Sequence, residues 1–309
     1  MDGLPVSLAS EDGCAELATG VQRTLKAAIS CVGVGLHSGK RVTLTLRPAG
    51  VNQGIVFRRT DLRRDIPARY DHVVDTRLCT VLGNGGARVS TVEHVMAALS
   101  GCGIDNAIVE LDGPEPPALD GSAAQFVFLI DCAGIIEQDE PRSAIEVRRV
   151  VRVTDGEAFA EFRPGMFGLD MALSIDFAAA AIGRQALSLH LNTGTFRHDL
   201  ARARTFTLAE EIEQLRAAGL ALGGSLDNAV VVDRARILNP AGLRSPDEFV
   251  RHKLLDAVGD LALAGAPLVG RFVAHRSGHT LNNKLLRALF ADRSSWRETS
   301  SPALSVAAA

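Results

Sequence analysis

This sequence of 309 residues lacks the cysteine pattern of a secreted, disulfide-stabilised protein. It has five cysteines, an odd number, all in its first half and without a CxxC pair. Such thiols are typical of a reducing compartment, so we expect a cytoplasmic protein. The segment Met1–Gly13 carries acidic residues and no basic stretch ahead of an apolar one, so we do not expect a secretory signal.

A strong net charge and long apolar runs are also missing. Lys and Arg total 33 against 36 Asp and Glu, which gives a formal net charge of −3. A chain without a positive field does not attract polyanions, so we expect no nucleic-acid partner. No apolar run approaches the ~20 residues that span a bilayer, which argues against integral membrane association.

The composition that remains is that of a globular chain with a sizeable core. Hydrophobic residues make up 47% and charged residues 22% of the sequence, which excludes a disordered or fibrous chain. At roughly 100 to 200 residues per domain, the length allows one large or two ordinary domains. The polar, proline-containing stretch Glu137–Ser143 is the best boundary between two domains. We therefore predict a mobile tail at 1–20, domains at 21–143 and 144–293, and a second mobile tail at 294–309.

Local patterns predict strands and helices in both halves. Short alternating or β-branched runs predict strands at Arg41–Arg47, Gly54–Arg59 and Asn106–Leu111. Apolar-faced segments predict helices at Ser122–Cys132 and at Ser90–Leu99, the latter opened by a capping box from Ser90 to Glu93.

The second half repeats the first in outline. Leu46–Pro48 followed by Gly54–Phe57 is similar to Phe162–Pro164 followed by Gly168–Met171, which predicts an internal duplication. The halves differ most in an insert around 204–228, for which we predict a helix at Leu208–Ala218 and a following strand at Asn228–Asp233.

The strongest candidates for chemistry are two histidines with nearby carboxylates. His252 and Asp256 stand four residues apart in Glu248–Ala264, a segment of good helix formers, so both side chains project from one helix face. A catalytic zinc ion takes about three protein ligands and keeps one open position, and His94 can supply the third ligand. Glu93, beside His94, can take a proton from water, as the carboxylate next to a ligand does in metalloproteases.

Each part of this centre also has an ordinary structural interpretation. An isolated His-Asp pair at this spacing is more often a surface helix pair than a metal site, and Glu93 is accounted for as a helix cap. His37, in the glycine-rich stretch Val34–Lys40, is a rival candidate for the third ligand. The stretch is also a candidate for contact with an anion, although it does not match a Walker motif. His279 follows a glycine in a loop, where it is either solvent-exposed or an acid, and Asp260 is either its orienting partner or a solvated helix charge.

Seven short motifs then identify a family. They occur in family order from about residue 22 to 292, and they are Gly33–Lys40, Asp75–Thr80, Ser90–His94, Leu119–Ala123, Ala203–Phe206, Phe249–Asp256 and Ser277–Lys284. Together they resemble the bacterial UDP-3-O-acyl-N-acetylglucosamine deacetylases, zinc amidases that commit the cell to lipid A synthesis.

The resemblance implies a fold class and a set of residue roles. The implied fold is α+β, with two similar domains that are each a β-sheet with helices on one face, the helices sandwiched between the two sheets and the active site at the domain interface. The implied centre is one zinc ion per chain bound by His94, His252 and Asp256, with Glu93 as the general base. The resemblance also implies that His279, oriented by Asp260, acts as an acid or stabilises the oxyanion. It implies that Thr205 contacts the substrate carbonyl. The residues implied to lie near the substrate are Lys253, Phe206 and His37.

The reaction implied by the resemblance is hydrolysis of the N-acetyl group of UDP-3-O-acyl-N-acetylglucosamine, which gives UDP-3-O-acyl-glucosamine and acetate. A monomer is expected, with the acyl chain in the insert around 208–226. Two alternatives stay open: a zinc amidohydrolase for another N-acyl amine, and a non-catalytic, zinc-stabilised nucleotide-sugar-binding protein. His and carboxylate ligands also suit Fe(II). Thr207 stands where the family usually has glycine, and Asp176–Ile182 lacks a His-Pro pair, so acyl-chain preference is left open.

Overall fold

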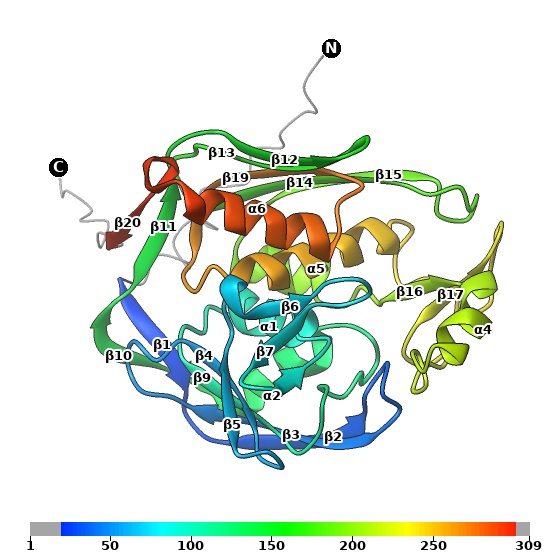
Figure 1. Cartoon of the computed structure of the whole chain (residues 1–309), viewed down its shortest axis with the longest axis horizontal. Helices are drawn as coiled ribbons and strands as arrows, with labels where there is room; N and C mark the ends of the chain where they lie inside the picture. The colour runs from blue at the N-terminus through cyan, green and yellow to red at the C-terminus, as the bar shows by residue number, and fades with distance from the viewer. Residues whose placement is uncertain (1–19, 301–309) are drawn as a thin grey trace.

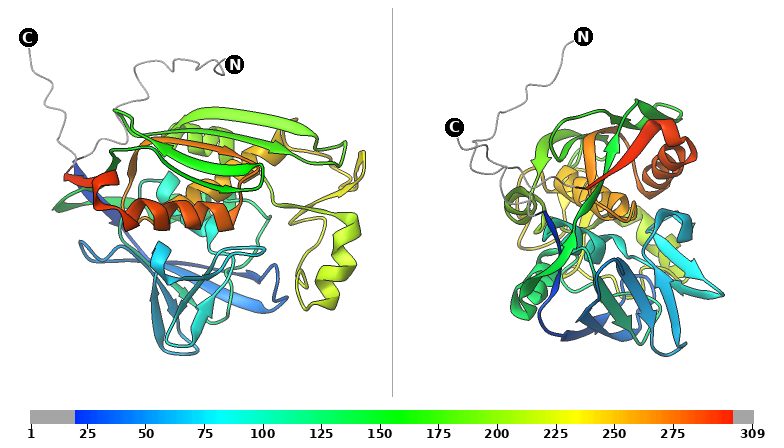
Figure 2. Two further views of the ribbon diagram at one scale, coloured as in Figure 1. Left: turned by 45° about the horizontal axis from the view of Figure 1, so that its top comes forward. Right: turned by 90° about the vertical axis from the view of Figure 1, so that its left-hand side faces the viewer.

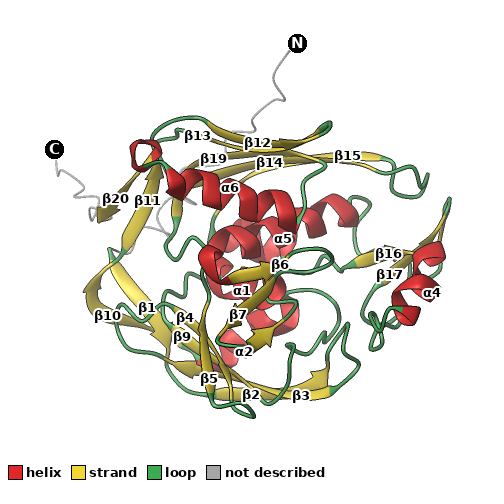
Figure 3. Cartoon of the chain, viewed as in Figure 1, coloured by secondary structure: helices red, strands yellow, loops and turns green. Residues whose placement is uncertain are grey.

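The computed structural model describes residues 20–300, and four of its helices lie between two β-sheets (Figures 1 and 3). The four are α1 (Glu93–Gly101), α2 (Ala124–Ala133), α5 (Glu248–Ala262) and α6 (His279–Ala291). Figure 2 shows the same layering from two further sides. The predicted α+β class, with helices sandwiched between two sheets, is therefore confirmed. Residues 1–19 of the predicted N-terminal tail lie outside the described residues.

The two sheets share one topology. The first has the order β2 (Ile29–Val34), β3 (Arg41–Pro48), β9 (Ala107–Leu111), β4 (Ile55–Arg59) and β5 (Arg64–Pro67). The second contains, in the corresponding places, β12 (Val151–Asp155), β13 (Ala158–Arg163), β19 (Leu268–His275), β14 (Leu169–Asp176) and β15 (Arg184–Leu191).

Strand directions correspond as well as strand order. In each sheet the third listed strand pairs in parallel with the fourth, and the other neighbours pair antiparallel. In each half a helix, α1 or α5, precedes that central strand along the chain, and a second helix, α2 or α6, follows it. The repeated sequence motifs thus correspond to a repeated βββ-β-α-β-α unit, as the predicted internal duplication requires.

Smaller elements complete each half. The first half adds β1 (Val21–Leu25) paired with β10 (Ile135–Pro141), and the small sheet β6 (Val73–Asp75), β7 (Val81–Asn84) and β8 (Ala87–Val89) after the 3-10 turn η2 (Tyr70–His72). The second half adds β11 (Ser143–Val147) and β20 (Trp296–Ser300), with η4 (Arg293–Ser295) before β20 and α3 (Thr193–Thr195) and η3 (Phe196–Leu200) after β15.

The insert forms a separate small sheet at one edge of the molecule (Figure 1). Its elements are β16 (Phe206–Leu208), α4 (Ala209–Ala217), β17 (Val230–Asp233) and β18 (Arg236–Ile237). The helix and strand predicted for this region are confirmed to within two residues at each end.

Alternating apolar residues explain how the sheets contribute to the core. In β3, Val42, Leu44 and Leu46 are buried, whereas the residues between them are only partly covered. In β13, Ala160 and Phe162 are fully buried, and the charged Glu161 between them is also buried. These apolar side chains belong to one apolar cluster that also contains most of the buried residues of α1 and α5, so the helices pack against both sheets.

The structure differs from three predictions about local structure. The C-terminal tail predicted from residue 294 is wrong as far as Ser300, because Trp296–Ser300 form β20 and pair with β11. The stretch chosen as a domain boundary lies mostly in β10, and its last residue, Ser143, begins β11. The capping box is also wrong: α1 begins at Glu93 itself, and its N-cap residue, Val92, makes no side-chain cap hydrogen bond. The division at 143 into domains stays a prediction.

Candidate metal centre and its acid–base neighbours

Two helices from different halves of the chain meet at a close contact. A Cβ atom added to Gly259 of α5 would lie 2.0 Å from the main-chain oxygen of Glu93 in α1, so only glycine allows this approach. The contact brings the first turn of α1, with Glu93 and His94, against the face of α5 that carries His252 and Asp256.

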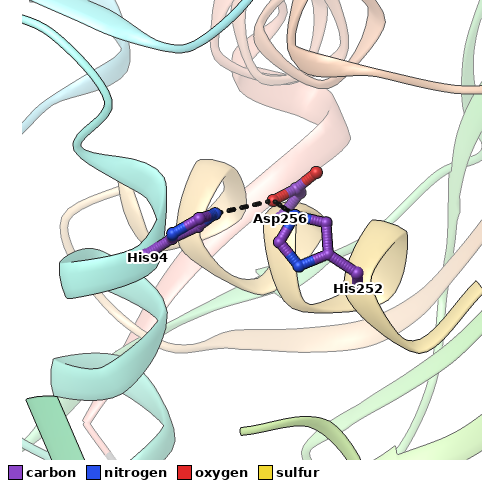
Figure 4. Close-up of side chains that lie close together, drawn as sticks. All are labelled: His94, His252 and Asp256. Carbon is purple, nitrogen blue, oxygen red and sulfur yellow. Dashed lines mark ion pairs between the residues drawn. The ribbon is translucent and has the colours of Figure 1, made fainter. Parts of the chain in front are cut away.

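His94, His252 and Asp256 form a compact buried cluster (Figure 4). One potential ligand atom from each side chain lies within 4.8 Å of the others. Asp256 Oδ1 is 3.3 Å from His252 Nε2 and 3.6 Å from His94 Nε2. Asp256 Oδ1 is buried and accepts no hydrogen bond, which is expensive for a carboxylate oxygen unless a cation binds it. The donor set therefore fits a metal ion with nitrogen and oxygen ligands.

His252 is oriented by a main-chain contact on its other nitrogen. Its Nδ1 lies 3.0 Å from the carbonyl oxygen of Ala203, which fixes Nε2 as the free atom that faces Asp256. The next residue, Arg204, is held by Glu248 at the start of α5 through its main-chain N–H (3.0 Å) and its guanidinium (2.8 and 3.0 Å). This buried ion pair thus fixes the Ala203 carbonyl relative to the helix that carries His252.

Burial and neighbouring charges shift the three pKa values of the cluster in different directions. Burial lowers the pKa of His252 to about 4, so this imidazole is neutral near pH 7. Burial alone would raise the pKa of Asp256, but His252 and Lys253 outweigh it and hold the pKa well below its usual value. Burial would also lower the pKa of His94, but the Asp256 carboxylate raises it overall. A proton on His94 therefore competes with a metal ion for the same atom.

Glu93 lies beside the cluster as a buried carboxylate. Its side chain is 4% exposed, and its Oε2 accepts a hydrogen bond of 3.0 Å from the main-chain N–H of Thr80. Burial is the main cause that raises the pKa of Glu93 above its ordinary value. A carboxylate whose proton affinity is raised in this way is suited to accept a proton from water.

His279 lies close to Glu93. Its Nε2 is 3.9 Å from Glu93 Oε1, and its Nδ1 donates to Asp260 Oδ2 at 2.9 Å. Burial alone would lower the pKa of His279, but Asp260 and Glu93 raise it to about 9. Of the two interpretations of Asp260, the structure therefore supports the orienting partner over the solvated charge, because Asp260 is buried within α5.

Lys253, Phe206 and Thr205, for which roles at the substrate are expected, each make a defined contact. Lys253 Nζ donates to Asp256 Oδ2 at 2.9 Å, so it contacts the carboxylate oxygen on the far side from both histidines. The Phe206 ring packs edge-on against His252, with 6.2 Å between centroids. Thr205 lies beside it and anchors its main-chain N–H on the oxygen of Gly121.

His37 is near the centre but outside the cluster. Among the described residues the metal-like group contains His94 and not His37, so the rival third ligand is not supported. Its main-chain N–H, with that of Ser38, donates to the buried Glu115, which also accepts from Thr91 Oγ1 at 2.7 Å. Its Nδ1 is buried without a hydrogen-bond partner in the described structure. Burial is the main cause that lowers the pKa of His37.

Reasoning from the sequence missed several residues that hold the centre. Thr80 contacts both Glu93 and Asp260, Asn282 donates to Asp260 Oδ2 at 2.8 Å, and Glu115 joins the His37 loop to the turn before α1. Thr80 and Asn282 lie inside motifs Asp75–Thr80 and Ser277–Lys284, which carried the resemblance without assigning them a role.

Similarity to known proteins covers nearly all of the described chain. A family model described as UDP-3-O-acyl N-acetylglycosamine deacetylase matches residues 22–291. A protein of Haemophilus influenzae named UDP-3-O-acyl-N-acetylglucosamine deacetylase is 53% identical over 280 residues, 89% of this chain and 92% of the relative. Proteins with the same name from Myxococcus xanthus (53% over 275 residues; 88% and 87%) and Actinobacillus pleuropneumoniae serotype 3 (50% over 280 residues; 89% and 92%) are also similar. Within residues 20–300, no helix combines the length and the hydropathy needed to cross a membrane.

Proposed function

The chain belongs to the family of UDP-3-O-acyl N-acetylglycosamine deacetylases, and we propose that it hydrolyses the N-acetyl group of UDP-3-O-acyl-N-acetylglucosamine in lipid A synthesis. The products are acetate and UDP-3-O-acyl-glucosamine. The observation that carries this proposal in the structure is the buried His94, His252 and Asp256 cluster with Glu93 and His279 beside it. A buried group of three metal-type donors next to a base and an acid is an arrangement suited to metal-assisted amide hydrolysis.

We propose zinc as the metal, held by His94, His252 and Asp256. Two neutral imidazoles and one carboxylate are an ordinary ligand set for catalytic zinc, and the orphaned Asp256 Oδ1 supports it. When bound, a zinc ion supplies Lewis acidity, which polarises a carbonyl oxygen and makes water a stronger nucleophile near neutral pH. Fe(II) is the alternative that the same ligands would accept.

The protein residues then divide the proton transfers. Glu93 takes a proton from the attacking water as the water oxygen bonds to the acetamide carbon. His279 carries a proton at neutral pH, and it gives this proton from Nε2 to the sugar nitrogen as the carbon–nitrogen bond breaks. Asp260 keeps that imidazolium charged and oriented through Nδ1. The proposed role of Thr205 is a hydrogen bond to the carbonyl oxygen that gains negative charge.

Substrate binding is proposed for the surrounding residues. Phe206 packs against His252 and thereby borders the centre, and His37 has a buried ring nitrogen free to bond to a ligand. Lys253 brings a positive charge suited to a phosphate group, although in the structure it pairs with Asp256. The acyl chain is proposed to follow the insert, where Leu222 and Leu226 are exposed apolar side chains.

Acetate release from UDP-3-O-acyl-N-acetylglucosamine tests the proposal. Protein of measured zinc content is compared with a chelator-stripped sample and with a sample reloaded with zinc. We expect release that disappears with the metal and returns with it, and much slower turnover of the substrate without its 3-O-acyl chain. Folded, zinc-loaded protein that releases no acetate would contradict the proposed substrate.

Three further parts of the proposal need their own measurements. Elemental analysis of protein purified from cells decides between zinc and iron. Sedimentation equilibrium decides whether the chain is the monomer we predict. Fractionation of cells decides whether it is in the predicted cytoplasmic location.

A further inference from the structure

Thr80 lies between Glu93 and the Asp260–His279 pair, and each of its polar groups makes a hydrogen bond there. It is 1% exposed and precedes β7. Its main-chain N–H donates to Glu93 Oε2 (3.0 Å), and its main-chain oxygen accepts from Val92 N (3.3 Å) at the start of α1. Its hydroxyl donates to Asp260 Oδ1 at 2.6 Å.

These contacts close a ring of four residues. From Thr80 the ring runs to Glu93, across 3.9 Å to His279 Nε2, from His279 Nδ1 to Asp260 at 2.9 Å, and back to the Thr80 hydroxyl. The two carboxylates come from α1 and α5, and the imidazole comes from α6. Thr80 is the member of the ring that is bonded to both carboxylates, so it fixes their separation.

We propose that Thr80 is a positioning residue for the deacetylation, which holds Glu93 and the Asp260–His279 pair at the spacing that the two proton transfers need. Its main chain sets Glu93, and its hydroxyl sets the carboxylate that orients His279. A misplacement of about 1 Å at a reacting group lowers rates on the order of 100-fold, so a hydroxyl at this place affects turnover more than substrate binding. This inference rests on the proposed function.

The role of the Thr80 hydroxyl is tested by one variant that removes it and one that keeps it. Thr80→Val keeps the shape and both main-chain bonds but leaves Asp260 Oδ1 without its donor, and Thr80→Ser keeps all three bonds. Thr24→Val is the matched control, because it removes a buried hydroxyl that contacts no residue of the ring: this hydroxyl donates to the Asn106 oxygen at 2.7 Å and accepts from the main-chain N–H of Ala49 at 3.0 Å. Thr80→Ala replaces Thr80→Val if the latter does not fold.

In zinc-loaded protein we expect Thr80→Val to lower kcat at least tenfold with KM within about twofold of the parent. We expect the kcat of Thr80→Ser to be within about threefold of that of the parent. The kcat of Thr24→Val should match that of the parent. A Thr80→Val kcat reduced by less than tenfold, an equal loss in Thr80→Ser, or a loss that appears in KM instead, would overturn the inference.

A second readout needs no substrate. NMR of histidine-labelled, zinc-loaded protein follows the Nδ1 proton of His279, which Asp260 protects from exchange with water. We expect that proton to exchange faster with water in Thr80→Val and unchanged in Thr80→Ser and Thr24→Val. An unchanged signal in Thr80→Val would refute the inference even if no acetate were released by the parent protein, whereas absence of acetate release alone would refute only the proposed function.

Discussion

The ionisable side chains at the centre differ in charge state because each has different neighbours. His252 is neutral through burial, whereas His279, which is also largely enclosed, is charged because Asp260 and Glu93 face it. A neutral imidazole is what a metal ligand needs, and a charged imidazole is what a proton donor needs. The same residue type is thus suited to two different roles, and its surroundings decide which.

If Glu93 is the general base, replacing its carboxylate should lower turnover. Glu93→Gln keeps the size of the side chain and an oxygen that accepts from Thr80 N–H, but it removes the proton acceptor. We expect kcat to fall roughly 100-fold to 10,000-fold. Zinc content and melting temperature measured on the same samples should match the parent, and activity that persists would mean that another group is the base.

The raised pKa of His279 predicts how stability and turnover depend on pH. The pKa of His279 is raised from 6.5 to about 9, so the folded protein holds this proton more tightly than the unfolded chain. Its contribution to stability is complete below about pH 6.5 and is lost as pH rises through about 9. We expect kcat to fall over the same range, because the proton donor is lost, and to fall at acid pH as Glu93 protonates at a raised pKa.

His279→Gln is the comparison for that profile. It should lower kcat and abolish the alkaline decrease near pH 9 while the acid decrease remains. An alkaline limb that is unaltered in this variant would assign it to a different group.

The residues of the centre differ in how far the sequence could predict them. His252 and Asp256 follow from helical spacing, because both lie on one helix face. His94 as third ligand needed the resemblance, since spacing alone left His37 as a rival. Thr80 lies in the motif Asp75–Thr80, but nothing local indicated its contacts: its partners are 13 and 180 residues away, and a threonine in a loop has no periodicity to reveal them.

At the scale of elements, the meeting of α1 and α5 decides whether the centre exists. The fit depends on Gly259, so Gly259→Ala should force the helices apart and displace His94 from His252 and Asp256. We expect a loss of at least about 2 kcal/mol of unfolding free energy and a lower zinc content. Urea unfolding and elemental analysis check both quantities.

Gly50→Ala is the matched control for this prediction. The nearest atom to an added Cβ there is 3.9 Å away and the backbone is not left-handed, so the change should stay within about 0.5 kcal/mol. A Gly259→Ala protein as stable and as metal-rich as this control would show that the helix contact is not needed.

Elements were easier to predict than their boundaries and partners. The strands of β3, β4 and β9 and the helix α5 occur where alternating and helical patterns indicated. The start of α1 was placed three residues early, because Ser90 and Glu93 fit a capping box in sequence while Glu93 bonds to Thr80 instead. β20 was missed because its short polar sequence has no apolar alternation, and pairing with β11 stabilises it.

A bound metal would link the two halves of the chain, because His94 belongs to the first and His252 and Asp256 to the second. A ligand that binds only the folded state adds about 4 kcal/mol at a concentration 1,000 times its Kd. We therefore expect the melting temperature to rise by several degrees with added zinc and to fall on treatment with a chelator. Differential scanning fluorimetry across zinc concentrations measures this.

Two variants separate the ligands in that experiment. Asp256→Ala should lose the zinc-dependent rise in melting temperature, whereas His37→Ala should keep it. Loss of the rise in His37→Ala would reopen the choice of the third ligand.

The pairing of β11 with β20 has a consequence for synthesis of the protein on the ribosome. The first sheet and the separate β1–β10 pair are complete by residue 141, whereas the second sheet is completed only by its edge strand β20, which pairs with β11 and places Ser143 opposite Ser300. The first half can therefore fold while the second is still being translated. The centre requires α5 from that later half, so metal loading is a late event in the life of the newly made chain.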